Sequence, residues 1–402
     1  MSRWPIVRFE ELAAREKSAF SKPYGSAYTK ADYSPHGVPL VRGVNLGTGR
    51  FHDDDFVYIT SEKADTLPGA NLAPGDLVIT HRGTIGQVSM IPRKPKHERY
   101  VLSTSQVKAR LDQDVAIPEF YYYWLTSPAG QQQILQNIST VGVPGLAQPV
   151  ATVKSFRVPR PPVSIQIAIA EFLGALDDKI AVNDRIARKA DALRSLRLTN
   201  ILQGQQTNVT EVPLSSLADF VNGRAFTKNA SGTGRMVVRI AELNSGPGAS
   251  TVYNTIEVPD KHIARPGDVL FAWSGSLCVA RWFRDEAIVN QHIFKVIPNN
   301  GMPSWLLHDL VQSKLAEFQR IAADKATTMG HIQRRHLDEP VRAPDETHIP
   351  TLDGELRPLW DRALLAERES LGLTKIRDAL LPKLMSGQVR IRDAERVVED
   401  VV

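Results

Sequence analysis

Cysteine is almost absent from this sequence, which holds a single one, Cys278, in 402 residues. One cysteine excludes an intrachain disulfide and any zinc site built from several thiolates. The N-terminus also lacks the apolar stretch of a signal peptide. The most apolar segment, residues 165–176, is interrupted by Gln166 and Glu171. We therefore expect no membrane span and a cytoplasmic location.

Catalytic motifs are a second absence. No Gly-rich loop leads into Gly-Lys-Ser/Thr, and no Gly-x-Gly-x-x-Gly opens a helix, so neither an ATP site nor a nucleotide-cofactor site is indicated. The Asn-Pro-Pro-aromatic motif of amino-methyltransferases does not occur either. Asp177-Asp178-Lys179 lacks the upstream carboxylate of a metal nuclease, and His331 and His336 are not framed by a glutamate. We expect no catalytic residue, no metal site and no cofactor in this chain.

Excess charge of one sign is also small. The chain has 49 Lys and Arg against 44 Asp and Glu, for a formal net charge of +5. This balance permits a nucleic-acid partner without demanding one. Hydrophobic residues make up 42% of the chain, an ordinary globular proportion. At roughly 150 residues per domain, the length suggests two to three domains.

The sequence does contain an internal repeat, which becomes visible when the chain is aligned with itself. The matched segments keep their order, and their offset falls from 205 to 182 residues along the non-helical part. The loops of the first copy are therefore longer, and a duplicated module explains the series better than chance. The matches include Leu12 with Leu217, Pro74-Gly75-Asp76 with Pro266-Gly267-Asp268, Ser105-Gln106 with Asn290-Gln291, Arg160 with Arg342, and Gly204 with Gly387.

Each copy opens with short apolar runs between Gly and Pro residues and closes with a long helical pattern. The runs at 76–80, 87–91 and 269–273 predict strands. The segments at 120–125 and 305–321, and the stretch that ends at 138, predict helices.

The two long patterns have narrow apolar seams that end at Gly204 and Gly387. Such seams predict that the two helices pair as a coiled coil, although each could instead pack on its own globular part. The expected packing residues are Leu173, Leu176, Ile180, Ala190, Leu193, Leu373, Ile376, Leu380 and Leu384.

Two polar loops recur in both copies. One follows the Pro-Gly-Asp strand, at 81–86 and 273–276, and the other lies at 139–148 and 325–335. Glycine allows a close backbone approach, hydroxyl and amide groups suit phosphate oxygens, and Arg and Gln can read purines. Each loop could be a structural turn or a solvated basic loop, but the recurrence favours a site for a polyanion.

Several motifs together form a distinctive pattern. They are Trp4-x-x-Val7-x-Phe9-x-x-Leu12, the two Pro-Gly-Asp strands, Asn290-Gln-His-Ile-Phe294, Thr327-Thr-Met-Gly-His-Ile332, and above all Leu373-Thr-Lys-Ile-Arg-Asp-Ala-Leu-Leu-Pro-Lys-Leu-Met-Ser-Gly387. This pattern resembles the specificity subunit of type I restriction-modification systems. The resemblance implies an α+β fold, with two mixed α/β target-recognition domains alternating with two long helices that pair as an antiparallel coiled coil. It implies recognition domains at 1–162 and 206–348, spacer helices at 163–205 and 349–390, and a C-terminal tail at 391–402.

This resemblance implies a non-catalytic subunit whose domains each read one half of a bipartite double-stranded DNA site. The helices would set the gap and dock two modification (methyltransferase) subunits, which would carry S-adenosylmethionine. Separate restriction subunits would use ATP and Mg. The competing classes are an enzyme (a nuclease or fused methyltransferase) and a protein-interaction scaffold without DNA contact.

The candidate DNA-contacting residues come from the recurring loops and the matched polar positions. They are Arg42, His81, Arg82, Thr84, Ser105, Gln106, Ser139, Thr140, Arg239, Trp273, Ser274, Ser276, Asn290, Gln291, His292, Lys325, Thr327, Thr328, His331, Gln333, Arg334 and Arg335.

Overall fold

The computed structural model describes residues 4–25, 27–47, 50–139, 144–204, 208–324 and 330–399. The chain forms two compact units, and the boundary between them falls within both long helices. Unit 1 comprises residues 1–178 with 373–402, and unit 2 comprises residues 179–372. Below, domain 1 denotes the described residues up to 162, and domain 2 those from 208 to 348.

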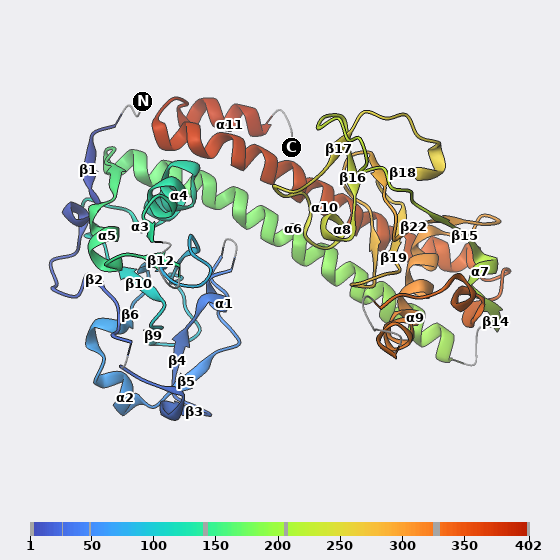
Figure 1. The fold of residues 1–402 in the computed structure, drawn as a ribbon, viewed down its shortest axis with the longest axis horizontal. Helices are drawn as coiled ribbons and strands as arrows, with labels where there is room; N and C mark the ends of the chain where they lie inside the picture. Colours follow the sequence, from blue (N-terminus) through green and yellow to red (C-terminus); the bar gives the residue numbers. More distant parts are fainter. Residues whose placement is uncertain are drawn as a thin grey trace. The chain divides into compact units, whose positions relative to one another are not determined.

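Domain 1 contains two sheets, drawn in blue and cyan in Figure 1. One has the strand order β2-β10-β7-β8 and the other β3-β5-β4-β9-β6, while β1 pairs with β13 and β11 with β12. The strands are β1 (Ile6–Arg8), β2 (Phe20–Ser21), β3 (Tyr33–Ser34), β4 (Val38–Val41), β5 (Val57–Ile59), β6 (Asn71–Leu72), β7 (Leu77–Thr80), β8 (Val88–Met90), β9 (Tyr100–Leu102), β10 (Gln106–Ala109), β11 (Ile138–Ser139), β12 (Gly145–Leu146) and β13 (Arg157–Pro159), and the α-helices are α1 (Gly43–Leu46), α2 (Ser61–Asp65), α3 (Pro118–Thr126), α4 (Pro128–Leu135) and α5 (Pro149–Ser155).

Domain 2 contains two sheets of related order, β15-β22-β19-β20 and β17-β16-β21-β18, and a separate pair β14-β23. In both domains the second sheet has one parallel pair, β4 with β9 and β16 with β21. The strands are β14 (Val209–Pro213), β15 (Ala218–Asn222), β16 (Arg235–Val238), β17 (Tyr253–Asn254), β18 (Ile263–Ala264), β19 (Val269–Ala272), β20 (Cys278–Arg281), β21 (Ala287–Val289), β22 (Ile293–Pro298) and β23 (Pro340–Pro344), and the α-helices are α7 (Leu214–Leu217), α8 (Ile240–Ser245) and α9 (Ser304–Asp324).

The central strand of each domain is buried on both faces because side chains alternate along it. In β7, Leu77 and Ile79 join the core beneath α3 and α4, whereas Val78 joins the core of the second sheet. In β19, Phe271 packs toward α9 and Leu270 toward the other sheet. The predicted strands and helices at these places are therefore confirmed.

The Pro-Gly-Asp motif builds the turn into both central strands. Gly75 and Gly267 have φ values of 87° and 94°, a left-handed conformation that glycine adopts without strain. One carboxylate oxygen of Asp76 accepts the Ala73 amide at 2.8 Å. The matching aspartate of domain 2 accepts the amide three residues before it at 2.7 Å. The motif is thus a structural turn that positions the following strand and its loop.

The duplication extends to buried side chains. The Lys108 ammonium of β10 donates to the Asn71 carbonyl at 3.0 Å, and Lys295 of β22 donates to the Ile263 carbonyl at 2.6 Å. Both lysines are almost completely buried. A buried ammonium needs such a partner, so the repeated arrangement indicates one inherited frame.

The strand register also corrects one sequence match. Gln106 lies opposite Thr80, and Ile293 lies opposite Ala272, the residue equivalent to Thr80. Ser105 is therefore equivalent to His292, two positions beyond the Asn290 with which the sequence aligned it. A match of only two polar residues does not determine the alignment, whereas the strand pairing determines which residues are equivalent.

The long helices are α6 (Val163–Gln203) and α10 (Ile349–Ser386), and α11 (Ile391–Glu399) follows α10. α6 begins directly after Pro161-Pro162 and ends before Gly204, as the sequence predicted. Figure 1 draws α6 in green and α10 in red. Among the described residues, no helix is long and apolar enough to cross a membrane.

In unit 2 the two helices pack antiparallel. Lys179 forms an ion pair with Glu369 at 2.9 Å, and further along α6 Arg197 approaches Glu355 at 3.8 Å. The Ser370 hydroxyl, on α10, donates to the α6 residue Asp184 at 3.0 Å. Small side chains allow close approach at the centre of this segment, where Ala187, Ala190, Ala363 and Ala366 are buried together.

In unit 1 the start of α6 and the end of α10 pack on each other and on domain 1. The guanidinium of Arg377 donates to Asp177 at 2.7 Å. Leu173, Leu380 and Leu384 join the core that contains α3. Both expectations for the seams therefore hold here, because the same helices contact each other and their globular domain. Leu176 and Leu373 are also buried.

The seam prediction is wrong at Leu193, which is 46% exposed. The buried position is taken by Arg194, which follows Ala190 at helical spacing and is 1% exposed. A pattern of apolar residues alone does not reveal this arginine, whose charge is paired inside the protein. Asn183, a polar residue on the same seam, is fully buried, whereas Ile180 and Ile376 are half-buried.

Candidate nucleic-acid interface

The two recurring loops of domain 1 lie side by side. The Leu146 amide donates to the His81 carbonyl at 3.0 Å, and Arg82 forms a backbone bridge with Gly145. The turn before β10 joins them, since the His81 amide donates to the Ser105 carbonyl at 2.9 Å. Three polar segments that are far apart in sequence thus meet at one end of β7.

Domain 2 repeats this convergence at the end of β19. The Ile332 amide donates to the Trp273 carbonyl at 3.1 Å, and Ser274 forms a backbone bridge with His331. The Trp273 amide donates to the His292 carbonyl at 3.1 Å. The same three backbone connections therefore bring the predicted loops together in both domains.

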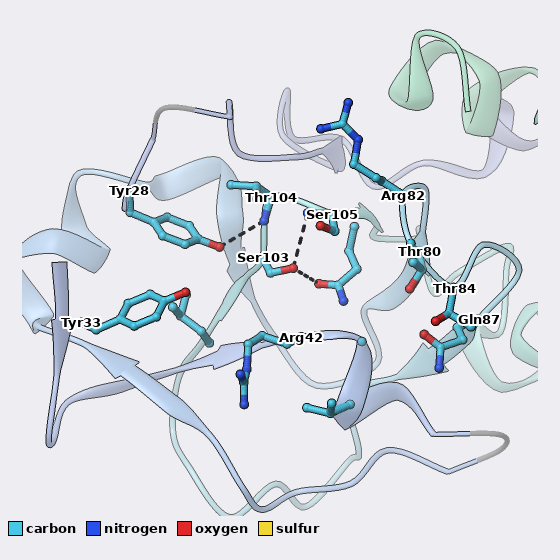
Figure 2. Close-up of a pocket in the computed structure, with 15 residues that line it drawn as sticks. Tyr28, Tyr33, Arg42, Thr80, Arg82, Thr84, Gln87, Ser103, Thr104 and Ser105 are labelled. Carbon is cyan, nitrogen blue, oxygen red and sulfur yellow. Dashed lines mark hydrogen bonds between the residues drawn. The ribbon is translucent and has the colours of Figure 1, made fainter. Parts of the chain in front are cut away.

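A hollow of about 500 Å³ opens between the two sheets of domain 1 (Figure 2). A second hollow of about 460 Å³ lies beside it and shares Arg82, Thr104 and Ser105. Their described lining residues include arginine and lysine but no aspartate or glutamate. This lining favours an anionic ligand. Polar groups at the first hollow come from Tyr28, Tyr33, Arg42, Arg82, Thr84 and Ser105.

The charges in this region are available to a ligand to different degrees. Arg82 is exposed, and within the described part of the chain no carboxylate pairs with it. The Arg42 guanidinium donates to the Asp55 backbone carbonyl at 3.0 Å, and no carboxylate among the described residues compensates its charge. Burial raises the pKa of Tyr28 to about 12, so its hydroxyl stays protonated. That hydroxyl accepts the Thr104 amide at 3.0 Å and holds the turn before β10 in place.

Four predicted contact residues point into the protein instead. The fully buried amide of Gln106 lies 2.7 Å from the Val41 carbonyl and 2.9 Å from the Gly43 amide, in the orientation that satisfies both. The His81 ring lies 3.1 Å from the Thr104 carbonyl, and burial, followed by the charges of Lys22 and Arg82, lowers its pKa.

The other two inward-pointing residues lie in domain 2. Asn290 accepts the Phe226 amide at 3.2 Å, and Ser274 is 5% exposed. The side chains of Gln106, His81, Asn290 and Ser274 are thus buried and support the frame, and their contact with DNA stays a prediction. Gln106 and His81 also line the two hollows.

Domain 2 presents a different set of side chains at the matching place. Gln291, His292 and Ser276 are exposed, and so are His331, Gln333, Arg334 and Arg335. The Trp273 ring lies among them, half-buried, with centroids 5.2 Å from His292 and 6.3 Å from His331. Arg239, the equivalent of Arg42, is bound by Glu242 at 2.5 Å, so its charge is compensated.

The remaining predicted residues are placed as follows. Ser139 and Thr84 lie at the edges of the hollows of domain 1. Thr140, Lys325, Thr327 and Thr328 lie outside the described residues. Among the described residues, no group of three or more His, Cys, Asp or Glu side chains is arranged to hold a metal ion.

Sequence reasoning missed Lys22, Tyr28, Tyr33 and Thr104, which also line the hollows. Tyr28 and Tyr33 lie in the segment that leads into the second sheet, whose short strands were not predicted. Lys22 directly follows β2, and Thr104 lies in the turn between β9 and β10.

The family model for the type I restriction modification DNA specificity domain matches residues 17–190. The matched range contains both hollows and the start of α6, and domain 2 repeats the frame of the specificity domain outside that range. Among curated proteins, no sequence matches the chain.

The fold is similar to that of the type I restriction-modification S subunit from M. genitalium, with a TM-score of 0.58 at 15% identity, over 95% of this chain and 96% of that chain. The HsdS subunit from Thermoanaerobacter tengcongensis aligns at 16% identity over 96% of this chain and 97% of that chain, with a TM-score of 0.38. The match over residues 17–190 and the shared fold make the chain similar to type I specificity subunits.

Proposed function

We propose that each domain binds one half of a bipartite site in double-stranded DNA. The observation that carries this proposal is the duplicated convergence of polar loops, at Arg82 and Gly145 in one domain and at Ser274 and His331 in the other. A protein with two homologous reading surfaces binds two separated sequences, because each surface covers only a few base pairs.

Duplex DNA fits the chemistry of these surfaces. Exposed arginines neutralise phosphates, and amide, hydroxyl and imidazole groups can hydrogen-bond to base edges in the major groove. The absence of acidic residues from the described lining of the two hollows removes a source of repulsion. A scaffold that binds only proteins has no need for such a lining.

We further propose that the helix pair sets the gap between the half-sites and docks two modification subunits. Large apolar side chains remain exposed on α6, at Val182, Leu193 and Leu196. At 100° per residue, these three positions lie within about 60° of each other on the helix. An exposed apolar helix face of this kind is typical of a protein interface.

In this proposal the chain holds no cofactor itself. S-adenosylmethionine belongs to the modification subunits, and ATP and Mg belong to restriction subunits that join the complex. The DNA-binding loops contribute recognition, while the partner subunits perform methylation and cleavage.

Selection from random-sequence duplexes tests the proposal, with the full chain bound to its modification subunits. We expect enriched DNA to contain two short sequences separated by a constant gap. Enrichment of one continuous sequence, or of none, would contradict it. Metal-dependent cleavage or methyl transfer by the isolated chain would instead favour an enzyme.

A further inference from the structure

His292 combines exposure with an unusual backbone conformation. Its φ is 72°, in the left-handed region that residues other than glycine adopt uncommonly. The equivalent Ser105 of domain 1, which is also described, has no positive φ. The turn itself therefore does not require the left-handed conformation, and a feature of domain 2 accounts for it.

Backbone hydrogen bonds on both sides hold the turn at His292. The Asn290 amide donates to the Val238 carbonyl at 3.1 Å, and the Gln291 amide donates to the Arg224 carbonyl at 3.0 Å. The His292 carbonyl accepts the Trp273 amide at 3.1 Å. A strained conformation persists where its surroundings determine it, and such residues cluster at functional sites.

Aromatic contacts orient the His292 side chain as well. Its ring is tilted by 53° against the Trp273 ring, with centroids 5.2 Å apart. The indole is fixed in turn, because its Nε1 donates to the Asn222 side chain at 2.8 Å. The imidazole is thus exposed but supported from one side, unlike the long side chains of Arg334 and Arg335 on the same surface.

We propose that His292 reads the major-groove edge of a purine in the half-site bound by domain 2, with Trp273 as its positioning residue. An imidazole N–H can donate to purine N7 or to guanine O6. A side chain with a fixed direction selects among base edges, whereas a flexible cation serves any phosphate. This inference rests on the proposed function and assigns one base-reading residue within it.

Duplex selection with the full chain and its modification subunits tests this role through variants of His292. H292G removes the ring and relieves the left-handed backbone, so we expect an unfolding midpoint no lower than that of the wild type. At one position of one half-site, the preference should disappear, and affinity for the wild-type site should fall about 10-fold. All other positions should keep their preferences.

Two further variants complete this test: H292N should change the base preference, and N300G is the control. Asparagine tolerates the left-handed conformation and pairs with adenine, so H292N should shift the preference at the same position toward adenine. Asn300 is also left-handed, with φ of 49°, but lies at the end of β22 away from the loops. N300G should therefore leave the selected sequence unchanged.

An unchanged selected sequence with H292G would overturn the assignment, as would an equal loss of affinity for all sequences. A wild-type complex that enriches no sequence would instead overturn the proposed function, and this inference with it. Duplex selection with the wild-type complex distinguishes these two failures.

Discussion

The two domains share a frame but use different side chains where they contact the helices. In domain 1, Met90 of β8 packs into the apolar core that includes the start of α6. In domain 2 the equivalent residue is Arg281, which binds Asp191 of α6 through two 3.0 Å bonds and Glu367 of α10 at 2.9 Å. The register of β7–β8 and β19–β20 establishes this equivalence.

A similar contrast appears at the recurring polar loops. Domain 1 offers a hollow with the uncompensated Arg42, whereas in domain 2 Glu242 compensates Arg239 and the positive charge lies on Arg334 and Arg335. The strands and turns of the frame are thus shared, whereas side chains at the helix contacts and in the recurring loops differ between the copies. The helix contacts and the loops can therefore be tested separately.

Arg281→Ala should have the largest effect, with a loss of about 3 kcal/mol in the unfolding free energy of unit 2. The side chain is 3% exposed and stacks 4.4 Å above the Trp360 ring. Its removal leaves Glu367 without its partner, whereas Asp191 keeps its ion pair with Arg194. Hydrogen exchange in β20 and α9 measures the loss.

Met90→Ala is the matched control in domain 1, and it should affect exchange in unit 1 only. Replacing Arg281 by Met together with Glu367→Gln should recover most of the stability, because Asp191 keeps Arg194 and no carboxylate is then left unpaired. A single Arg281→Ala variant as stable as the wild type would refute the proposed role of this ion cluster.

The double variant Arg334→Ala with Arg335→Ala should lower the slope of log affinity against log salt by about 2, since each lost phosphate contact removes roughly 0.9. Both residues are exposed in the loop of domain 2. The loss should be similar for all sequences, because phosphates carry no sequence information. Salt titrations of duplex binding measure it, and an unchanged slope would exclude phosphate contact.

Arg42 and Arg239 occupy equivalent positions in the two domains. Replacing each by alanine should change the salt slope by a smaller amount, and by a different amount in each domain. Arg42→Ala should lower the salt slope by about 0.9, because its charge is free to meet a phosphate. Arg239→Ala should leave the slope unchanged, because Glu242 already compensates the charge. Equal slope changes in the two variants would show that this ion pair does not distinguish the domains.

Much of the fold was predictable from the sequence because its signals are local. The long helices followed from apolar spacing bounded by proline and glycine, and the central strands from the Pro-Gly-Asp turns. The second sheets were not predicted, because strands such as Asn71–Leu72 and Ile263–Ala264 are too short to show periodicity. Their pairing depends on contacts distant in sequence.

The candidate site was predicted in outline and corrected in detail. Recurrence identified the loops that meet in both domains, but it could not separate exposed from buried polar residues. The polar side chains of Gln106 and Asn290 form hydrogen bonds with backbone groups, and only the fold shows this. Arg194 is buried in place of Leu193 because its guanidinium donates to the buried Asp309 at 2.7 Å. Asp309 is remote in sequence, so the apolar pattern of the helix could not predict this pairing.

Each domain is proposed to read one half-site while the helices set the gap. This proposal is tested most directly by duplicating residues 184–190 in α6 and residues 364–370 in α10, which face each other through the bond between Asp184 and Ser370. Seven added residues lengthen each helix by about 10 Å, and a base pair spans about 3.4 Å. Duplex selection should return the same two half-sites with a gap longer by about 3 base pairs. An unchanged gap, or altered half-sites, would contradict the account.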